Sequence, residues 1–367
     1  MSEDLNLLYT DVEESVRDSV RSLLAKRCAP EKVVALYDGG DAGQRELWQA
    51  LAGELGLAAL LVPEEHGGAG ASAREASVVL EELGRFVAPV PFLTSAVVAT
   101  TALVEAGAGK LLGPLAAGEQ TAALAVPLTT SPDGPIPAVT ADGGALQGTA
   151  TSVAGALEAD VLLVPVRTEG GLQLHRVPAE AARITPLTSL DMTRQIADVD
   201  VTGAPADAVA EGEAAERAVR AALETGAALM ASEQLGVAQW CLDTTVAYLK
   251  VRRQFGRIVG GFQALKHRLA DLYVMVESAR AAARYAAAAL AADDPDRPVA
   301  ASLAQAYCAD AAVLAAEECI QLHGGIGMTW EHPAHLYLKR AKADQLAFGT
   351  PGAHHARLAD LVDLPAA

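Results

Sequence analysis

One long alanine- and leucine-rich stretch constrains the fold of this chain more than any other feature. It runs from residue 213 to 251 as EAAERAVRAALETGAALMASEQLGVAQWCLDTTVAYLKV. Hydrophobic residues make up 51% of the chain and aromatic residues only 4%, and alanine, the strongest helix former, supplies most of the excess. The stretch predicts either one very long helix or two helices in line.

The pattern of apolar residues divides the chain into three parts. Residues 1–118 show helical patterns joined by short loops, with Thr10 or Asp11 as the first N-cap. Residues 119–206 hold short apolar runs between Gly, Pro and Asp turns, which is typical of a small β-domain. Residues 207–367 return to helical periodicity. We therefore predict a mostly α fold with a β insert: an N-terminal helical domain, a middle β-domain, and a C-terminal helical bundle that carries an oligomer interface.

Charge and cysteine usage exclude several classes of protein. The net charge of -18 argues against nucleic acid or an anionic membrane as a partner. Four scattered cysteines without metal or redox spacing predict reduced core residues in a cytoplasmic protein. The sequence has no apolar run of about 18 residues, so we expect no membrane span. We expect no metal site either, and we place the adjacent His354 and His355 on the surface.

This acidic chain keeps one segment purely basic. The segment VRRQFGRIVGGFQALKHR, residues 251–268, contains no acid and five cations: Arg252, Arg253, Arg257, Lys266 and Arg268. A dense cationic loop suits a phosphate or diphosphate. A solvated turn that balances nearby acids would show the same composition, so both interpretations stay open at this point.

A second segment, QLHGGIGMTWEHP at residues 321–333, combines a glutamine with closely spaced glycines. Gln321 can pair with a base edge or a ribose. Gly324, Gly325 and Gly327 allow a ligand to approach the backbone. A helix end followed by a turn would produce the same pattern, and taken alone this segment favours that simpler interpretation.

Together the two segments resemble those of the acyl-CoA dehydrogenase family. The first is similar to the family's R-x-x-F-G…F-Q segment and the second to its Q-x-x-G-G-x-G…E-x-P segment, while VPEEHGGAG resembles its P-E-x-x-G-G-x-G loop. The domain order agrees as well, so the resemblance covers nearly the whole chain. It implies FAD as the cofactor, an acyl-CoA as the substrate and an electron-transfer flavoprotein as the electron acceptor.

The resemblance also implies which residues contact the cofactor. In that family the two C-terminal segments reach across a subunit interface and hold the diphosphate and adenine of a neighbouring chain's FAD. Matching the motifs residue by residue gives cofactor-binding roles to Arg252, Gln254, Phe255, Gln263, Gln321, Gly324 and Gly325. The basic segment would then face a cofactor diphosphate.

The family's catalytic base is absent from both of its usual positions. Family members remove the α-proton of the acyl-CoA with a carboxylate while hydride leaves the β-carbon. The common position, in an E-G-T stretch, is Phe348 here, and the alternative on the long helix is Gly226, followed by Ala227 where an arginine often stands. Neither a phenyl ring nor a glycine can accept a proton.

Two other carboxylates remain as candidate bases. Glu224 lies two residues before Gly226, so it points to the opposite side of a helix. Glu233 lies seven residues after it, on a similar face but roughly 10 Å further along the axis. In a chain with 46 acids, a solvated or interhelical carboxylate explains both more simply.

The predicted β-domain departs from the family as well. The family's T-E-P-G-x-G-S-D loop falls near residues 125–135, where the chain has VPLTTSPDGPI. Its W-x-T segment, which touches the flavin ring, aligns with Ser152, Val153 and Ala154. One active site has therefore lost its base, its arginine and its flavin contacts, while the half that serves a neighbour's FAD remains.

This asymmetry resembles heteromeric acyl-CoA dehydrogenases, in which one composite site per pair of related chains holds FAD. It implies a heterotetramer of this chain with a homologous catalytic subunit, active only as a complex, in lipid or steroid catabolism. Two alternatives stay open: a flavin enzyme of the same fold with other, monooxygenase-like chemistry, and a cofactor-free scaffold protein.

Overall fold

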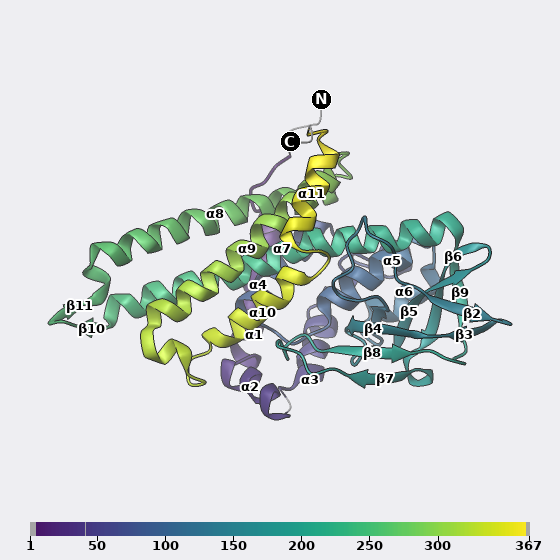
Figure 1. The fold of residues 1–367 in the computed structure, drawn as a ribbon, viewed down its shortest axis with the longest axis horizontal. Coiled ribbons are helices and arrows are strands. Elements are labelled where there is room, and N and C mark those ends of the chain that lie inside the picture. Colours follow the sequence, from purple (N-terminus) through teal and green to yellow (C-terminus); the bar gives the residue numbers. More distant parts are fainter. Residues whose placement is uncertain (1–4, 41, 365–367) are drawn as a thin grey trace.

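The long stretch forms a single helix, α7 (Gly212–Val251), which spans most of the length of the molecule (Figure 1). The structure, a computed structural model, describes residues 5–40 and 42–364. The β region lies at one end of α7, and a helical hairpin forms the opposite tip. This helix therefore connects the two parts of the molecule in which function is expected.

The C-terminal bundle packs four further helices around α7. They are α8 (Gln263–Ala291), α9 (Arg297–His323), α10 (Ala334–Leu346) and α11 (Pro351–Leu361). Alanines fill much of the α7–α9 contact, including Ala227, Ala304 and Ala312, which are fully buried. Side chains this small allow helix axes to approach closely, so the alanine excess in the sequence has a packing role.

The N-terminal helices form a layer against α7. They comprise α1 (Asp11–Arg27), α2 (Pro30–Val34), α3 (Gln44–Gln49), α4 (Ala73–Phe86), α5 (Thr100–Glu105) and α6 (Leu112–Ala116), with the π-helical segments η2 (Ala50–Glu54) and η5 (Phe92–Ala99). Thr10 caps α1 in a capping box with Glu13, which confirms Thr10 as the N-cap. Helix α4 crosses α7 so closely that a Cβ on Gly236 would lie 1.9 Å from the Glu81 carbonyl oxygen.

The strands of the β region lie between Ala122 and Glu211. They are β1 (Ala122–Leu124), β2 (Val139–Asp142), β3 (Ala145–Gln147), β4 (Thr149–Ala154), β5 (Val161–Thr168), β6 (Gly171–Pro178), β7 (Arg183–Pro186), β8 (Ile196–Asp200) and β9 (Asp207–Glu211). One sheet has the order β3-β2-β5-β6-β9 with β1 beside β5, and a second has the order β4-β8-β7. Both pack around a small apolar core of their own.

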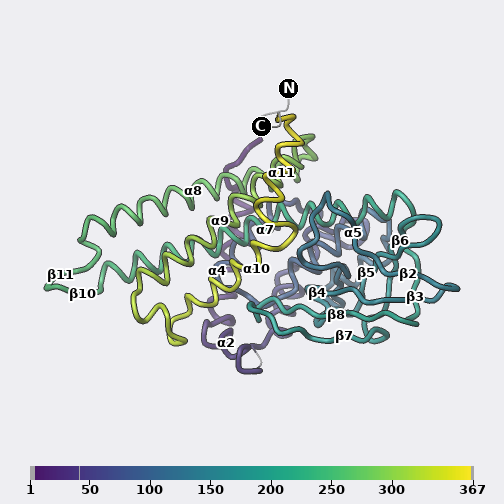
Figure 2. The backbone as a smooth tube through the Cα atoms, in the orientation of Figure 1, coloured from purple at the N-terminus to yellow at the C-terminus, as the bar shows by residue number. Residues whose placement is uncertain are grey.

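The expected start of the C-terminal helices at residue 207 is wrong by one strand. Residues Asp207–Glu211 pair antiparallel with β6, so the sheet continues to Glu211 and α7 begins at Gly212. The physical reason is that Asp207–Glu211 pairs with the edge of β6 and so continues the sheet instead of starting a helix. The rest of the helix–strand–helix order agrees with the sequence, and the tube view shows it plainly (Figure 2).

Two expectations about the apolar residues are also tested. The four cysteines are free and buried, as predicted. In the described part of the chain, one segment, residues 297–328, is long and apolar enough to cross a membrane, and 72% of its most apolar window is buried inside the molecule. Burial among other helices is what a core helix requires, so α9 gives no support for a membrane span.

Candidate functional site

The basic segment forms the exposed hairpin that joins α7 to α8. Arg252 ends α7, and strands β10 (Arg253–Gln254) and β11 (Arg257–Ile258) pair around a two-residue turn at Phe255 and Gly256. Both turn residues have positive φ, 52° and 73°, as a tight hairpin turn requires. The Phe255 ring is 87% exposed at the tip of the molecule, and it meets the Phe262 ring edge-on with the ring centroids 6.2 Å apart.

The cations of this hairpin are only partly neutralised within the chain. Arg257 stacks on the Phe262 ring at 3.8 Å, and Arg268 pairs with Glu318 of α9 at 2.6 Å. In the described residues, the side chains of Arg252, Arg253 and Lys266 have no hydrogen-bond or ion-pair partner, and all three are exposed. These free cations, with the exposed Gln254 and Gln263, can bind an anionic group from outside the chain.

The second predicted segment lies at the same end of the bundle (Figures 1 and 2). Gln321, in the last turn of α9, and Gly324 and Gly325, in the turn that follows, are all exposed. Gly324 has φ +66°, and a Cβ on either of these two glycines would meet no atom within 4 Å. The Arg268–Glu318 pair ties the two segments together, so the structure brings the seven predicted cofactor-binding residues to one end of the molecule.

A buried aromatic stack supports this exposed turn. The His323 ring lies 4.5 Å from the Tyr248 ring of α7 and 4.1 Å from the His332 ring. His323 Nδ1 donates to the Cys319 carbonyl oxygen at 2.7 Å. Local sequence patterns could not predict this stack, because Tyr248 is distant in the chain from His323 and His332.

The two family base positions face each other in the middle of the molecule. A Cβ on Gly226 would lie 2.7 Å from Cζ of Phe348 and 3.0 Å from Cγ2 of Val98. Phe348 is 4% exposed. The phenyl ring therefore fills the space above Gly226, and the two departures from the family motifs are sterically complementary.

The chain's own backbone closes the same region from the β side. The Phe348 N–H donates to the Leu128 carbonyl oxygen at 2.8 Å, and the Leu128 N–H donates to that of Ser152 at 3.1 Å. Ala154 and Leu223 complete the lining of a residual cavity of about 20 Å³. A three-ring flavin needs many times this volume, so the residues present here do not fit a flavin ring.

One sequence expectation near this closed region is wrong. His354 is buried, and its Nε2 lies 3.0 Å from the carbonyl oxygen of Phe348, although we expected it on the surface. Burial lowers the pKa of His354 and favours the neutral ring. His355 is exposed, as predicted. Among residues 5–40 and 42–364, no group of three or more His, Cys, Asp or Glu side chains could hold a metal.

Glu233, the better of the two alternative bases, is locked in a buried ionic cluster. Arg194 Nη2 donates to both of its oxygens at 2.7 Å, and Arg340 Nη1 donates to one at 2.5 Å. Burial would raise the pKa of Glu233, but the two guanidinium groups outweigh it and hold the pKa below its usual range. A carboxylate held in this way is a poor proton acceptor, because it must first break two ion pairs.

The same cluster contains two further acids that sequence reasoning missed. Asp191 lies 2.9 Å from Arg340 Nε, and Asp344 lies 2.5 Å from Arg194 Nη1. Burial, with the nearby Glu233 charge, raises the pKa of Asp344 to about 7. The spacing of Arg340 and Asp344 on one helix face was a sequence signal, but nothing indicated that Arg194 joins them from the β region.

Glu224 is also engaged in a structural contact. It lies 2.8 Å from Arg357 of α11 and 3.4 Å from Arg297 of α9. These contacts hold three helices together on the side of α7 that faces away from Gly226, as the helical spacing predicted. Both alternative carboxylates therefore fit the interhelical role, and neither lines the space around Phe348.

Comparisons with known proteins agree with this geometry. Residues 10–119 match the acyl-CoA dehydrogenase N-terminal domain, and residues 216–361 match the C-terminal domain. The chain is 35% identical to "Acyl-CoA dehydrogenase IpdE2" of Mycolicibacterium smegmatis over 342 residues, which covers 93% of this chain and 96% of the relative.

Two solved structures extend the comparison. A chain of the ChsE4-ChsE5 complex from Mycobacterium tuberculosis superposes with a TM-score of 0.86 at 28% identity, covering 99% of this chain and 100% of that one. A chain of the Tcur3481-Tcur3483 steroid ACAD variant superposes with a TM-score of 0.83 at 29% identity, covering 96% and 98%. By sequence and by structure along almost its whole length, this chain belongs to the acyl-CoA dehydrogenase family.

Proposed function

We propose that this chain is the subunit of a heteromeric FAD-dependent acyl-CoA dehydrogenase that lacks the base and completes the FAD site of a homologous catalytic partner. One observation carries the proposal: Phe348 packs into the space above Gly226, so that the chain's own half-site is closed. The open cationic end supports it, because Arg252 and Arg253 have no partner within the chain's described residues.

The residues at the open end would hold the partner's cofactor. The Arg252 guanidinium would bind the diphosphate, and the Gln321 amide would pair with adenine or ribose. Gly324 and Gly325 would let the cofactor approach the backbone, because they have no side chains. Gln254, Phe255 and Gln263 complete this surface. When bound, FAD supplies the acceptor for the hydride that leaves the acyl β-carbon. This chain's residues bind and orient the cofactor, and the catalytic partner provides the carboxylate that removes the α-proton.

The absence of a base extends to the whole closed region. Phe348, Gly226, Val98 and Leu223 offer no group that can accept a proton. A Phe348→Glu change alone would bury a carboxylate among apolar side chains without reopening the flavin space, so it should not restore activity. This packing also disfavours a monooxygenase-like role, which needs a flavin pocket as well.

The proposal includes a class of substrate and a cellular setting. The solved relatives include a steroid acyl-CoA dehydrogenase pair, so we propose a bulky acyl-CoA of lipid or steroid catabolism as the substrate. The closure of one half-site per pair would leave more room at the other. An electron-transfer flavoprotein would accept the electrons, and the complex, a heterotetramer, would work in the cytoplasm, where free cysteines stay reduced.

The test compares the chain alone with the chain co-expressed with a homologous, base-bearing subunit. Alone, the purified protein should lack the visible absorption of flavin and should not oxidise acyl-CoA with an artificial electron acceptor. With the partner, the complex should be yellow and active. A yellow homo-oligomer that turns over acyl-CoA would overturn the proposal, whereas a colourless complex without activity would favour the scaffold role.

A further inference from the structure

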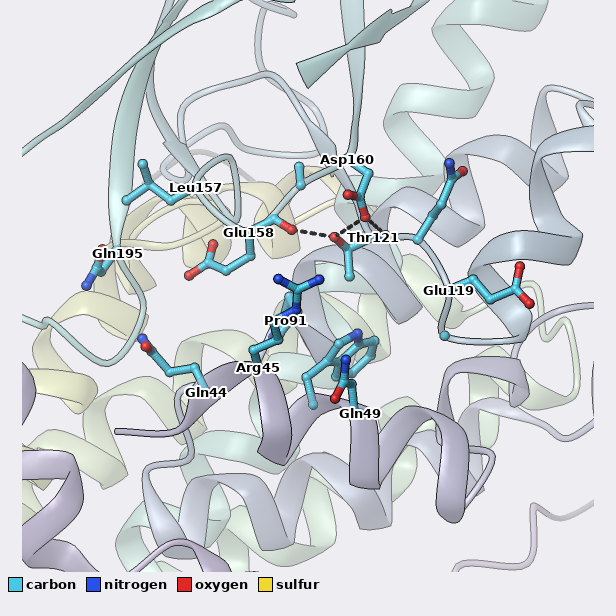
Figure 3. Close-up of a pocket in the computed structure, with 14 residues that line it drawn as sticks. Gln44, Arg45, Gln49, Pro91, Glu119, Thr121, Leu157, Glu158, Asp160 and Gln195 are labelled. Carbon is cyan, nitrogen blue, oxygen red and sulfur yellow. Dashed lines mark hydrogen bonds between the residues drawn. The ribbon is translucent and has the colours of Figure 1, made fainter. Parts of the chain in front are cut away.

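A cavity of about 520 Å³ lies away from both regions described above, between the N-terminal helices and the β region (Figure 3). Three segments distant in sequence line it: helix α3, the Gly118–Thr121 connection between α6 and β1, and the Leu157–Asp160 loop between β4 and β5. Pro91 and Gln195 complete the walls. Its volume suits a small organic molecule.

Hydrogen bonds fix the walls of this cavity. Thr121 Oγ1 donates to the Glu158 carbonyl oxygen, and the Thr121 N–H donates to Asp160 Oδ2 at 2.8 Å. The Asp160 N–H returns a bond to the Thr121 carbonyl oxygen at 2.9 Å. Gly118 approaches η2 so closely that a Cβ there would lie 2.8 Å from that of Ala52. The cavity is thus preformed rather than a gap between mobile loops.

Two buried polar atoms on these walls lack a protein partner. Trp48 is 6% exposed, and its Nε1–H has no acceptor among the described residues. Glu158 Oε2 is buried without a donor, and burial raises the pKa of this carboxyl group. Unpaired buried polar groups cost free energy, so these two shielded atoms favour a ligand that displaces the side chains covering them and satisfies both.

Arg45 adds a free positive charge to the same cavity. Its side chain extends from α3 into the cavity toward Glu158, as Figure 3 shows, yet no ion pair joins the two. In the described part of the chain Arg45 has no hydrogen-bond partner either. The cavity therefore presents an unpaired cation and an unpaired carboxylate on different walls.

We propose that this cavity binds a small zwitterion of the amino-acid type, whose carboxylate faces Arg45 and the Trp48 indole N–H and whose ammonium group faces Glu158. A simple anion fits less well, because Glu119, Glu158 and Asp160 outnumber the one cation, Arg45. An uncharged polyol would leave both charges without a counter-charge. The amide side chains of Gln44, Gln49, Gln120 and Gln195 can bind the remainder of the ligand, since amides both donate and accept.

The experiment is a ligand-observed NMR screen of the full-length protein against the twenty L-amino acids at millimolar concentration, followed by calorimetry on the strongest binder. At least one amino acid should bind the wild-type protein. Glu158→Gln and Arg45→Gln should each weaken its Kd about tenfold or more, as expected for a lost charge-assisted contact. Glu119→Gln, at the exposed rim, is the matched control and should change the Kd less than about twofold.

Thermal unfolding of each variant identifies any loss of fold, and Arg45 is exposed, so its replacement should leave the fold intact. Binding of no amino acid, which would leave water as the occupant, overturns the proposal. Binding that survives both Glu158→Gln and Arg45→Gln overturns it too. If glycerol or glucose binds and both variants weaken that binding in the same way, the ligand is a polyol rather than a zwitterion, and the proposal is overturned.

Discussion

Two regions along α7 differ in whether the chain itself fills the expected functional positions: the region around Gly226, here called the closed end, and the region around Arg252, called the open end. Around Gly226, Phe348 and the Leu128 backbone fill the space where both family base positions meet. Around Arg252, roughly 40 Å along the same helix at 1.5 Å per residue, the side chains are exposed and the cations unpaired. The chain's own packing fills the closed end, whereas under the proposed function a partner's cofactor would neutralise the cations of the open end.

Under the proposed function, this difference means that the two halves of a composite site can be lost and kept separately. At the closed end the Phe348 ring fills the space above Gly226 and keeps the helices packed. At the open end Arg252, Arg253 and Lys266 have no side-chain partner among the described residues, which leaves them available for the proposed cofactor contact. The experiments below test whether each end behaves as this contrast requires, in order of decreasing expected effect.

The largest effect should come from the buried ionic cluster beside the closed end. Glu233→Gln removes the charge that Arg194 and Arg340 share, and breaking a buried pair costs about 3–5 kcal/mol. Urea unfolding of the purified chain measures the loss. Glu213→Gln, in a fully exposed helix pair, is the control and should leave the unfolding midpoint unchanged. Equal midpoints for the two variants would show that the cluster does not stabilise the closed end.

At the open end, Arg252→Ala should weaken FAD binding by the assembled complex. A charge-assisted contact to phosphate contributes about 1.5–3 kcal/mol, so the affinity should fall roughly 10- to 100-fold. Flavin titration of the apo-complex gives this value. Arg253→Ala is the neighbouring control and should have a smaller effect. FAD affinity identical in wild type and Arg252→Ala would remove this residue from the cofactor site.

Gly226→Ala tests the packing of the closed end directly. The added Cβ would press on the Phe348 ring, and overpacking costs about 1–3 kcal/mol, more than the roughly 0.5–1 kcal/mol that alanine gains over glycine in a helix. In a Phe348→Leu background the same change should become neutral or stabilising. A double-mutant cycle measured by urea unfolding isolates this coupling. Additive changes would mean that the ring and the glycine do not compensate each other.

Gly325→Val should have the smallest effect on the chain itself. A Cβ there meets no atom within 4 Å and the φ angle is not positive, so thermal unfolding of the chain should stay unchanged. In the complex, the branched side chain should reduce FAD binding. Gly327→Val is the contrasting control, because its Cβ would lie 2.4 Å from the Ile320 carbonyl oxygen and should lower the melting temperature. Unchanged FAD binding by Gly325→Val would place the cofactor elsewhere.

Local patterns in the sequence were sufficient for the order of elements and for the motifs. Alanine-rich periodicity predicted α7, and short apolar runs predicted β5 and β6. The motifs also identified Phe348 and Gly226 as departures from the family. What they could not show is that these residues touch, because 122 positions separate them and only tertiary packing brings them together.

Long-range ion pairs and the burial of single side chains could not be predicted from the sequence either. Glu233 joins Arg194 from the β region and Arg340 from α10, so no local window contains the cluster. His354 is predicted on the surface because adjacent helical histidines cannot face one ligand together, but its ring is buried and bonds to the Phe348 carbonyl oxygen. The strand Asp207–Glu211 is short and none of its residues is fully buried, and its pairing depends on an available edge of β6.

The most direct test of the central claim is to count FAD in the assembled complex by native mass spectrometry. The chain is co-expressed with a homologous base-bearing subunit, and masses are recorded for the intact complex and after FAD release. We predict equal numbers of the two chains and one FAD per pair, because only the partner's half-site would admit the flavin ring. Two FAD molecules per pair would contradict the account, because they would require a flavin in the region that Phe348 fills.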